Sequence, residues 1–268
     1  MLAGDYRSND HGDGVELAQL RPYAPGDDVR DLEWNVTART GVPHVRVNLA
    51  ERALVTWLLL DTSPSMQFGT ADRRKADVAD GVALAIAHVA TRRGNRLGVA
   101  TFGDEEPATL PPHQGRVGLV GLLDVLAREP HREGGGATSL AAGLLRVASL
   151  ARQRGVVVIV SDFRGPLDWR RALLQLLGRH QVLAVEIRDP REQQLPDVGE
   201  VWLVDPETGR QVRVDTANRD LRDRFATAAA EERSGVARVL AALAVPHVVL
   251  STEGDWLRPL AAFLGAKR

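Results

Sequence analysis

The amino-acid sequence predicts an α/β protein built on a doubly wound, mostly parallel β-sheet. From residue 50 onward, short apolar runs rich in β-branched residues alternate with longer segments of helical period. Strands and helices that alternate in this way imply right-handed crossovers, with helices on both faces of the sheet. Before residue 50 the chain is polar and turn-rich. We therefore expect an N-terminal extension over residues 1–50, packed on a main domain over residues 51–268.

The predicted elements of the main domain follow one another closely. Strands are expected at residues 54–60, 96–102, 155–160, 181–187 and 247–250, with a short edge strand at 108–110. Helices are expected between an N-cap at Thr70 and Gly94, at residues 115–127, 139–154, 169–177 and 218–243, and from 255 onward. Residues 201–204 and 211–214 flank a Pro-Glu-Thr-Gly turn and predict an inserted β-hairpin. Its Trp202 is expected to pack against the sheet; the alternative is an exposed contact residue.

Composition excludes several classes of function. The 268 residues contain no cysteine, which rules out disulfides, thiolate metal sites and cysteine nucleophiles. Lys and Arg total 34 against 35 Asp and Glu, and Lys75 and Lys267 are the only lysines, so no basic stripe for nucleic acid is expected. The apolar runs are shorter than the roughly 20 residues of a membrane span, and residues 1–14 lack the features of a signal peptide. We expect a cytoplasmic protein without a membrane segment.

Small oxygen donors follow two of the predicted strands. Asp61, Ser63 and Ser65 come directly after the first strand, and Asp162 follows the strand at residues 155–160. Ligands of such folds bind at the carboxyl ends of the strands. If these two strands are neighbours, both carboxylates face one crevice.

A fifth donor comes from Thr138, which follows a Gly-Gly-Gly-Ala stretch at the start of a predicted helix. Two carboxylates and three hydroxyls suit a hard cation such as Mg²⁺ (or Mn²⁺), which prefers octahedral oxygen coordination. Each residue also has an ordinary structural explanation, because aspartate and serine are common in turns and threonine is a good helix N-cap. Their joint placement favours the metal.

The pattern Asp61-x-Ser63-x-Ser65, with Thr138 and Ser161-Asp162, resembles the metal-ion-dependent adhesion site of von Willebrand factor A domains. The resemblance implies a Rossmann-like fold in which the three hydroxyls bind the metal. It also implies that Asp61 and Asp162 act mainly through water or as supporting partners. An acidic side chain of a bound partner would complete the octahedron.

The N-terminal extension resembles one subgroup of these proteins in particular. The stretch Arg-Pro-Tyr-Ala-Pro-Gly-Asp-Asp-Val-Arg at residues 21–30, followed by Glu-Trp and Thr-Ala-Arg, is similar to a bacterial subgroup of unassigned function usually encoded beside MoxR-type AAA+ ATPases. Such an ATPase is then the implied partner, with Arg30, Trp34 and Arg39 as candidate contact residues. The favoured alternative is structural: residues 21–28 form consecutive turns, Trp34 packs on the sheet, and the two arginines pair with nearby acids. A strand is expected over residues 42–49.

An enzyme is the main competing class. An aspartate at the end of a first strand, together with magnesium, also describes phosphatase-type hydrolases. That pattern requires a second carboxylate two residues on, where this chain has Ser63. It also calls for a lysine near the phosphoryl group, and Lys75 is predicted to lie inside the first helix, away from the site. We therefore predict a non-enzymatic, magnesium-dependent protein-binding module; a metal-dependent hydrolase and a metal-free scaffold are the alternatives.

Overall fold

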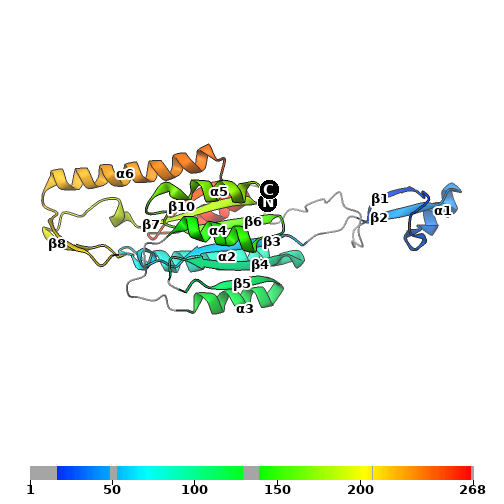
Figure 1. Cartoon of the computed structure of the whole chain (residues 1–268), viewed down its shortest axis with the longest axis horizontal. Coiled ribbons are helices and arrows are strands. Elements are labelled where there is room, and N and C mark those ends of the chain that lie inside the picture. Colours follow the sequence, from blue (N-terminus) through cyan, green and yellow to red (C-terminus); the bar gives the residue numbers. More distant parts are fainter. Residues whose placement is uncertain (1–16, 49–52, 105, 129–138, 207, 267–268) are drawn as a thin grey trace. The chain divides into compact units, whose positions relative to one another are not determined.

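The computed structural model describes residues 17–48, 53–104, 106–128, 139–206 and 208–266. These residues fall into two compact units, one within Gly4–Ala53 and the other within Leu54–Arg268 (Figure 1). That the extension packs on the main domain stays a prediction.

The N-terminal unit is a two-stranded antiparallel sheet with a short helix. Its elements are β1 (Leu17–Pro22), the 3₁₀ turn η1 (Val29–Asp31), α1 (Trp34–Thr40) and β2 (His44–Asn48). β2 confirms the predicted strand. The prediction of turns from residue 21 is wrong for its first two residues, because Arg21 and Pro22 pair with β2 as the end of β1. Arg21 then holds the turn by donating to both carboxylate oxygens of Asp27, at 2.7 and 2.6 Å.

The main unit contains the predicted sheet. Its strands are β3 (Val55–Asp61), β4 (Arg96–Phe102), β5 (Thr109–Gln114), β6 (Gly155–Ser161), β7 (Gln181–Arg188) and β10 (His247–Ser251). They lie in the order β10-β7-β6-β3-β4-β5, and only the edge strand β5 is antiparallel to its neighbour. β3 and β6 are therefore adjacent and parallel at the centre, as the predicted site requires.

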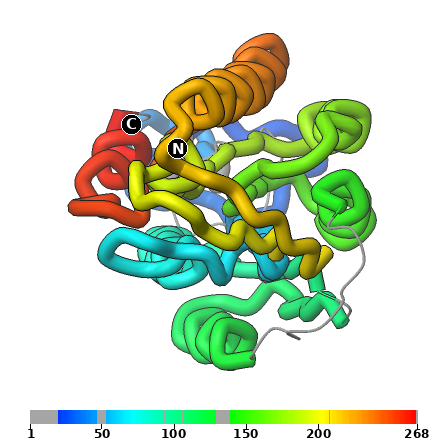
Figure 2. The backbone as a smooth tube through the Cα atoms, turned by 90° about the vertical axis from the view of Figure 1, so that its left-hand side faces the viewer, coloured from blue at the N-terminus to red at the C-terminus, as the bar shows by residue number. Residues whose placement is uncertain are grey.

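Helices cover both faces of this sheet (Figure 2). The first face packs against α2 (Lys75–Ala90), α3 (Gly115–Leu126) and α7 (Leu257–Gly265). The second face packs against α4 (Leu140–Leu150), α5 (Arg170–Leu177) and α6 (Arg219–Ala242). Alternate residues of β3 enter the two cores: Leu58 lies in the first, and Trp57 and Leu59 lie in the second. The doubly wound α/β prediction is thus confirmed.

The start of α2 differs from its prediction. Thr70 caps no helix; its N–H and hydroxyl both donate to the Asp189 carboxylate, at 2.8 and 2.6 Å. The helix begins five residues later, at Lys75, where the Arg74 N–H donates to Asp77 at 2.8 Å. Thr70 thereby ties the loop before α2 to the end of β7, and the helix starts beside the carboxyl ends of the strands.

The predicted hairpin is present as β8 (Glu200–Val204) and β9 (Gln211–Asp215), an antiparallel pair. The expectation that Trp202 packs against the sheet is wrong, because its side chain is 63% exposed. The two-stranded ribbon pairs with no third strand among the described residues, so its outer edges are unpaired there. In the described part of the chain, no helix has the length and apolar character to cross a bilayer.

We expect Leu58→Ala to lower the free energy of unfolding by about 2–5 kcal/mol, because it leaves a cavity in the first core. Leu58 has no exposed surface and lies at the centre of β3. Leu84→Ala on α2, where the leucine is 38% exposed, is the matched control and should cost less than about 1 kcal/mol. Urea denaturation measures both. Equal losses would show that the sheet centre is not the core.

Candidate metal centre

The loop after β3 gathers three of the predicted donors. β3 ends at Asp61, and the 3₁₀ turn η2 (Pro64–Gln67) begins after Ser63. The Ser63 N–H donates to the Asp61 carboxylate at 3.0 Å, and the Ser63 and Ser65 hydroxyl oxygens lie 3.0 Å apart. All three side chains are buried. The turn therefore holds two hydroxyls beside the carboxylate that ends the strand.

The end of β6 closes the cluster from the other side. The Ser161 hydroxyl donates to Asp61 at 2.6 Å, and the Ser65 hydroxyl donates to Asp162 at 2.8 Å. Phe163 has a left-handed backbone (φ 54°) that is uncommon for a phenylalanine, and its buried ring packs edge-on against Trp169 at a centroid distance of 5.9 Å. This bend places the next N–H, that of Arg164, 3.1 Å from the Asp162 carboxylate.

The spacing of these oxygens suits a small octahedral cation. Two adjacent ligands at about 2.1 Å from Mg²⁺ lie roughly 3.0 Å from each other. The Ser63–Ser65 separation is 3.0 Å, and the Ser65–Asp162 separation is 2.8 Å. Across the described ranges, no three His, Cys, Asp or Glu side chains cluster to hold a metal, so hydroxyls would have to complete the ligand set. The residues present fit that requirement. Thr138, the remaining predicted donor, lies outside the described residues.

The electrostatics of the cluster are set by burial. Burial of Asp61, followed by the charge of Asp162, raises the pKa of Asp61 to about 7, although hydrogen bonds from Ser161 and Ser63 oppose the shift. The carboxylate is consequently costly to ionise unless a cation comes near. A divalent ion is the kind of partner that would stabilise its charged form.

The position of Lys75 corrects the sequence prediction. We expected this lysine to lie away from the site, but its ammonium nitrogen is 2.6 Å from an Asp162 oxygen, and the side chain has no exposed surface. The late start of α2 is the reason: Lys75 is the first residue of the helix and points into the cluster instead of along the helix. The same Asp162 oxygen accepts from Ser65 and Lys75.

Glu192 is a second residue that the sequence analysis missed. It follows β7, and its carboxylate lies 2.6 Å from the Lys75 ammonium and 3.0 Å from the Arg164 guanidinium. Two carboxylates thus hold one buried ammonium. Lys75 carried a usable signal, because it is one of only two lysines among 34 basic residues. Nothing distinguished Glu192 from the other acids of the chain.

The candidate contact residues of the N-terminal unit are all exposed within that unit. Trp34, the first residue of α1, is 68% exposed, so it does not pack on the two-stranded sheet of its own unit; that it packs on the sheet of the main unit stays a prediction. Arg30 and Arg39 are exposed as well. Among the described residues of this unit, the acid partners are Asp27 for Arg21 and Glu33 for Arg46.

One family profile and several curated proteins match most of this chain. The profile of the family described as "Protein of unknown function DUF58" matches residues 19–235. Two proteins described as uncharacterized, Rv1480 of Mycobacterium tuberculosis and Mb1516 of Mycobacterium bovis, are each 42% identical to this chain over 270 residues, covering 100% of it and 84% of their own length.

Solved structures show the fold. The conserved hypothetical protein BatB of Bacteroides thetaiotaomicron aligns with a TM-score of 0.50 at 12% identity, covering 80% of this chain and 98% of that one. A structure described as the SpRpn10 VWA domain aligns over 80% of this chain and 95% of its own, with 14% identity and a TM-score of 0.42. The sheet order and the likeness to BatB are those of a von Willebrand factor A-like α/β fold.

Proposed function

Since this chain belongs to the DUF58 family, whose function is unknown, we propose that it is a magnesium-dependent protein-binding module in which the metal captures an acidic side chain of a partner. The observation that carries the proposal is the set of hydrogen-bonded oxygens at the ends of β3 and β6. Asp61, Ser63, Ser65 and Asp162 come from two loops that the sheet brings together, at separations suited to one small cation.

In this proposal the hydroxyl groups bind the metal, and Asp61 orients them. The Ser63 and Ser65 hydroxyls would hold the ion, with the Thr138 hydroxyl as a third donor. Asp61 orients the cluster, since it accepts from the Ser63 N–H and from the Ser161 hydroxyl. When bound, Mg²⁺ supplies positive charge and an open coordination position. Neutral hydroxyl donors leave that charge largely uncompensated, so an external carboxylate is the natural remaining ligand.

Lys75 favours this function over an enzymatic one. A phosphoryl-transfer site needs a lysine that is free to hold the phosphoryl oxygens. The Lys75 ammonium is fully buried and already lies 2.6 Å from each of two carboxylates, those of Asp162 and Glu192. Ser63 also stands where the phosphatase pattern needs a second carboxylate. We therefore propose a binding module and not a hydrolase.

For the partner we propose a MoxR-type AAA+ ATPase, with this protein acting as its adaptor. The support is the resemblance of residues 21–39 to the subgroup encoded beside such ATPases, together with the exposed Arg30, Trp34 and Arg39 of the N-terminal unit. A cytoplasmic location and a partner-supplied Asp or Glu belong to the same proposal.

The test is binding of the MoxR-type ATPase from the same genome, measured by calorimetry in Mg²⁺, in Mn²⁺ and in EDTA. We expect binding in either metal and none in EDTA. Asp61→Ala and Ser65→Ala should abolish the metal-dependent binding while circular dichroism shows a retained fold. Ser149→Ala, which removes an exposed hydroxyl on α4, is the control and should bind like the wild type. Equal binding in EDTA would favour the metal-free scaffold instead.

A further inference from the structure

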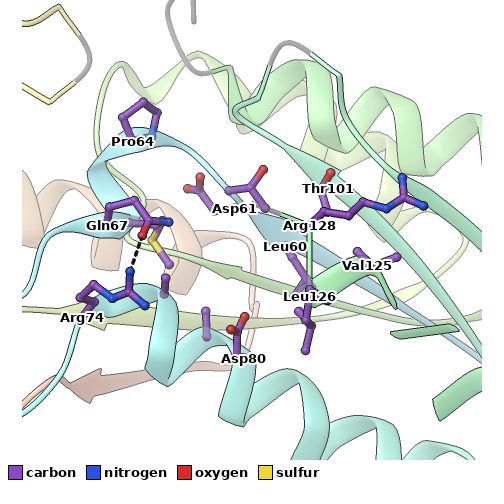
Figure 3. A pocket seen from close by; sticks show the side chains of 15 residues that line it. Leu60, Asp61, Pro64, Gln67, Arg74, Asp80, Thr101, Val125, Leu126 and Arg128 are labelled. Carbon is purple, nitrogen blue, oxygen red and sulfur yellow. Dashed lines mark hydrogen bonds between the residues drawn. The ribbon is translucent and has the colours of Figure 1, made fainter. Parts of the chain in front are cut away.

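A cavity of about 510 Å³ opens beside the candidate metal centre, between α2 and α3 (Figure 3). It shares Asp61 with that centre and is lined by Pro64, Met66 and Gln67 of the loop after β3. Such a volume is in the range of ligand-binding sites, roughly 300–1,000 Å³. The cavity and the metal centre are therefore neighbours, close enough for one partner segment to contact both.

The walls of the cavity are mainly apolar. They are formed by Leu60 of β3, Ala76 and Ala79 of α2, and Val125 and Leu126 of α3. An occupant must consequently carry an aliphatic stem, because burying it against these side chains is what the cavity can stabilise.

One carboxylate in these walls lacks a hydrogen-bond partner. Asp80 of α2 is half-buried and accepts no hydrogen bond from any residue that the structure describes. In Figure 3 it stands between Arg74 on one side and Leu126 on the other. Burial, followed by the charge of Asp77, raises the pKa of Asp80 to about 6, although the charge of Arg74 opposes the shift. A carboxylate in this position is stabilised by an incoming cation.

The two arginines that line the cavity, Arg74 and Arg128, pair with other acids than Asp80. Arg74 lies 2.8 Å from Asp77 and donates to Gln67 at 3.0 Å, the bond drawn in Figure 3. Arg128 lies 3.2 Å from Asp124, and both side chains are exposed. Among the described residues neither forms a direct ion pair with Asp80, although the charge of Arg74 acts on it from a distance, so the Asp80 oxygens remain open to a cationic ligand.

We propose that this cavity binds a lysine or arginine side chain of the partner, with its stem along Leu60, Ala79 and Leu126 and its cationic group at Asp80. The inference rests on the proposed function, since it places this basic residue close to the acidic residue that the metal captures. It makes the recognised segment bipartite, with one acidic and one basic side chain.

The cavity is tested first without metal. Binding of n-pentylammonium and n-butylguanidinium is followed by amide chemical shifts in EDTA at pH 8, with n-pentanol as the uncharged probe. We expect both cations to shift the amides of residues 76–80 and 125–128, and n-pentanol to bind at least about tenfold more weakly, as for the loss of one charge-assisted hydrogen bond. Asp80→Asn should weaken cation binding by a similar factor, and Asp124→Asn on the exposed face of α3 should not. Equal binding to wild type and Asp80→Asn would overturn the proposal.

The second test adds Mg²⁺ and two synthetic peptides, each with one glutamate followed after two glycines by lysine or by norleucine. We expect the lysine peptide to bind more tightly than the norleucine peptide, and the difference to vanish in Asp80→Asn. If the cavity binds the free cations but the lysine peptide binds no more tightly than the norleucine peptide, the cavity binds small-molecule amines instead of a partner side chain. That result would contradict the proposal. If neither peptide responds to Mg²⁺ while the cations still bind in EDTA, the proposed function fails by itself.

Discussion

Replacing Lys75 by methionine is expected to lower the free energy of unfolding by about 3–5 kcal/mol. Methionine keeps an unbranched side chain, one heavy atom shorter than that of lysine, and removes its charge. Asp162 and Glu192 then remain buried, or nearly so, without the ammonium that lies 2.6 Å from each of them. Urea denaturation in EDTA measures the loss. Mg²⁺ should recover part of it, because a bound cation would replace the missing charge beside Asp162.

Arg74→Met is the matched control for this prediction. Arg74 is adjacent in sequence, and its side chain is 54% exposed where it pairs with Asp77 at 2.8 Å. An exposed pair of this kind contributes only about 0–1 kcal/mol. If both variants lost the same small amount, the buried ammonium would not be the counter-ion of the cluster, and the assigned role of Lys75 would be wrong.

The second large effect is a loss of metal-free stability as the pH rises from about 4 to about 7. Burial and the charge of Asp162 raise the pKa of Asp61 to about 7 in the native state, from 3.8 in the unfolded chain. As the pH rises, the unfolded state therefore releases this proton at a lower pH than the native state does. Between the two pKa values each rise in pH lowers the free energy of unfolding. The contribution reaches about 4 kcal/mol near pH 7 as an upper bound, and stays constant above that pH.

The measurement is the free energy of unfolding from pH 4 to pH 8 in EDTA, for the wild type and Asp61→Asn. The difference between the two curves isolates Asp61, because other groups titrate in both proteins. Asp189 is one of these: hydrogen bonds from Thr70 and Thr252, despite its burial, lower its pKa, so its contribution is present at neutral pH and is lost in acid. Parallel curves for the two proteins would show that Asp61 is ionised in the native cluster.

The α/β architecture follows from local sequence patterns. Each buried parallel strand is a largely apolar run that contains β-branched residues. Gly155–Ser161, with four valines and an isoleucine, is the clearest example, and such runs predict a strand. The helices between them were recognisable from their period. The helix predicted from residue 218 is α6, which begins at Arg219 after the N-cap Asn218. The start of α2 was not, because Thr70 looks like an N-cap and only its contact with Asp189, 119 residues away, directs it elsewhere.

The sequence by itself determined the strands, the helices and the small oxygen donors that follow β3 and β6, because periodicity and strand-end position are local properties. Which charged side chains contact those donors was decided by the tertiary structure alone. Lys75 and Glu192 are separated by 117 residues and meet at Asp162 only because the sheet order places the ends of β3, β6 and β7 beside the start of α2. The Asp80 cavity has the same origin, since the packing of α2 and α3 on β3 leaves a space that no local pattern records. Side-chain charges in the centre are therefore balanced by partners that only the folded chain brings into contact.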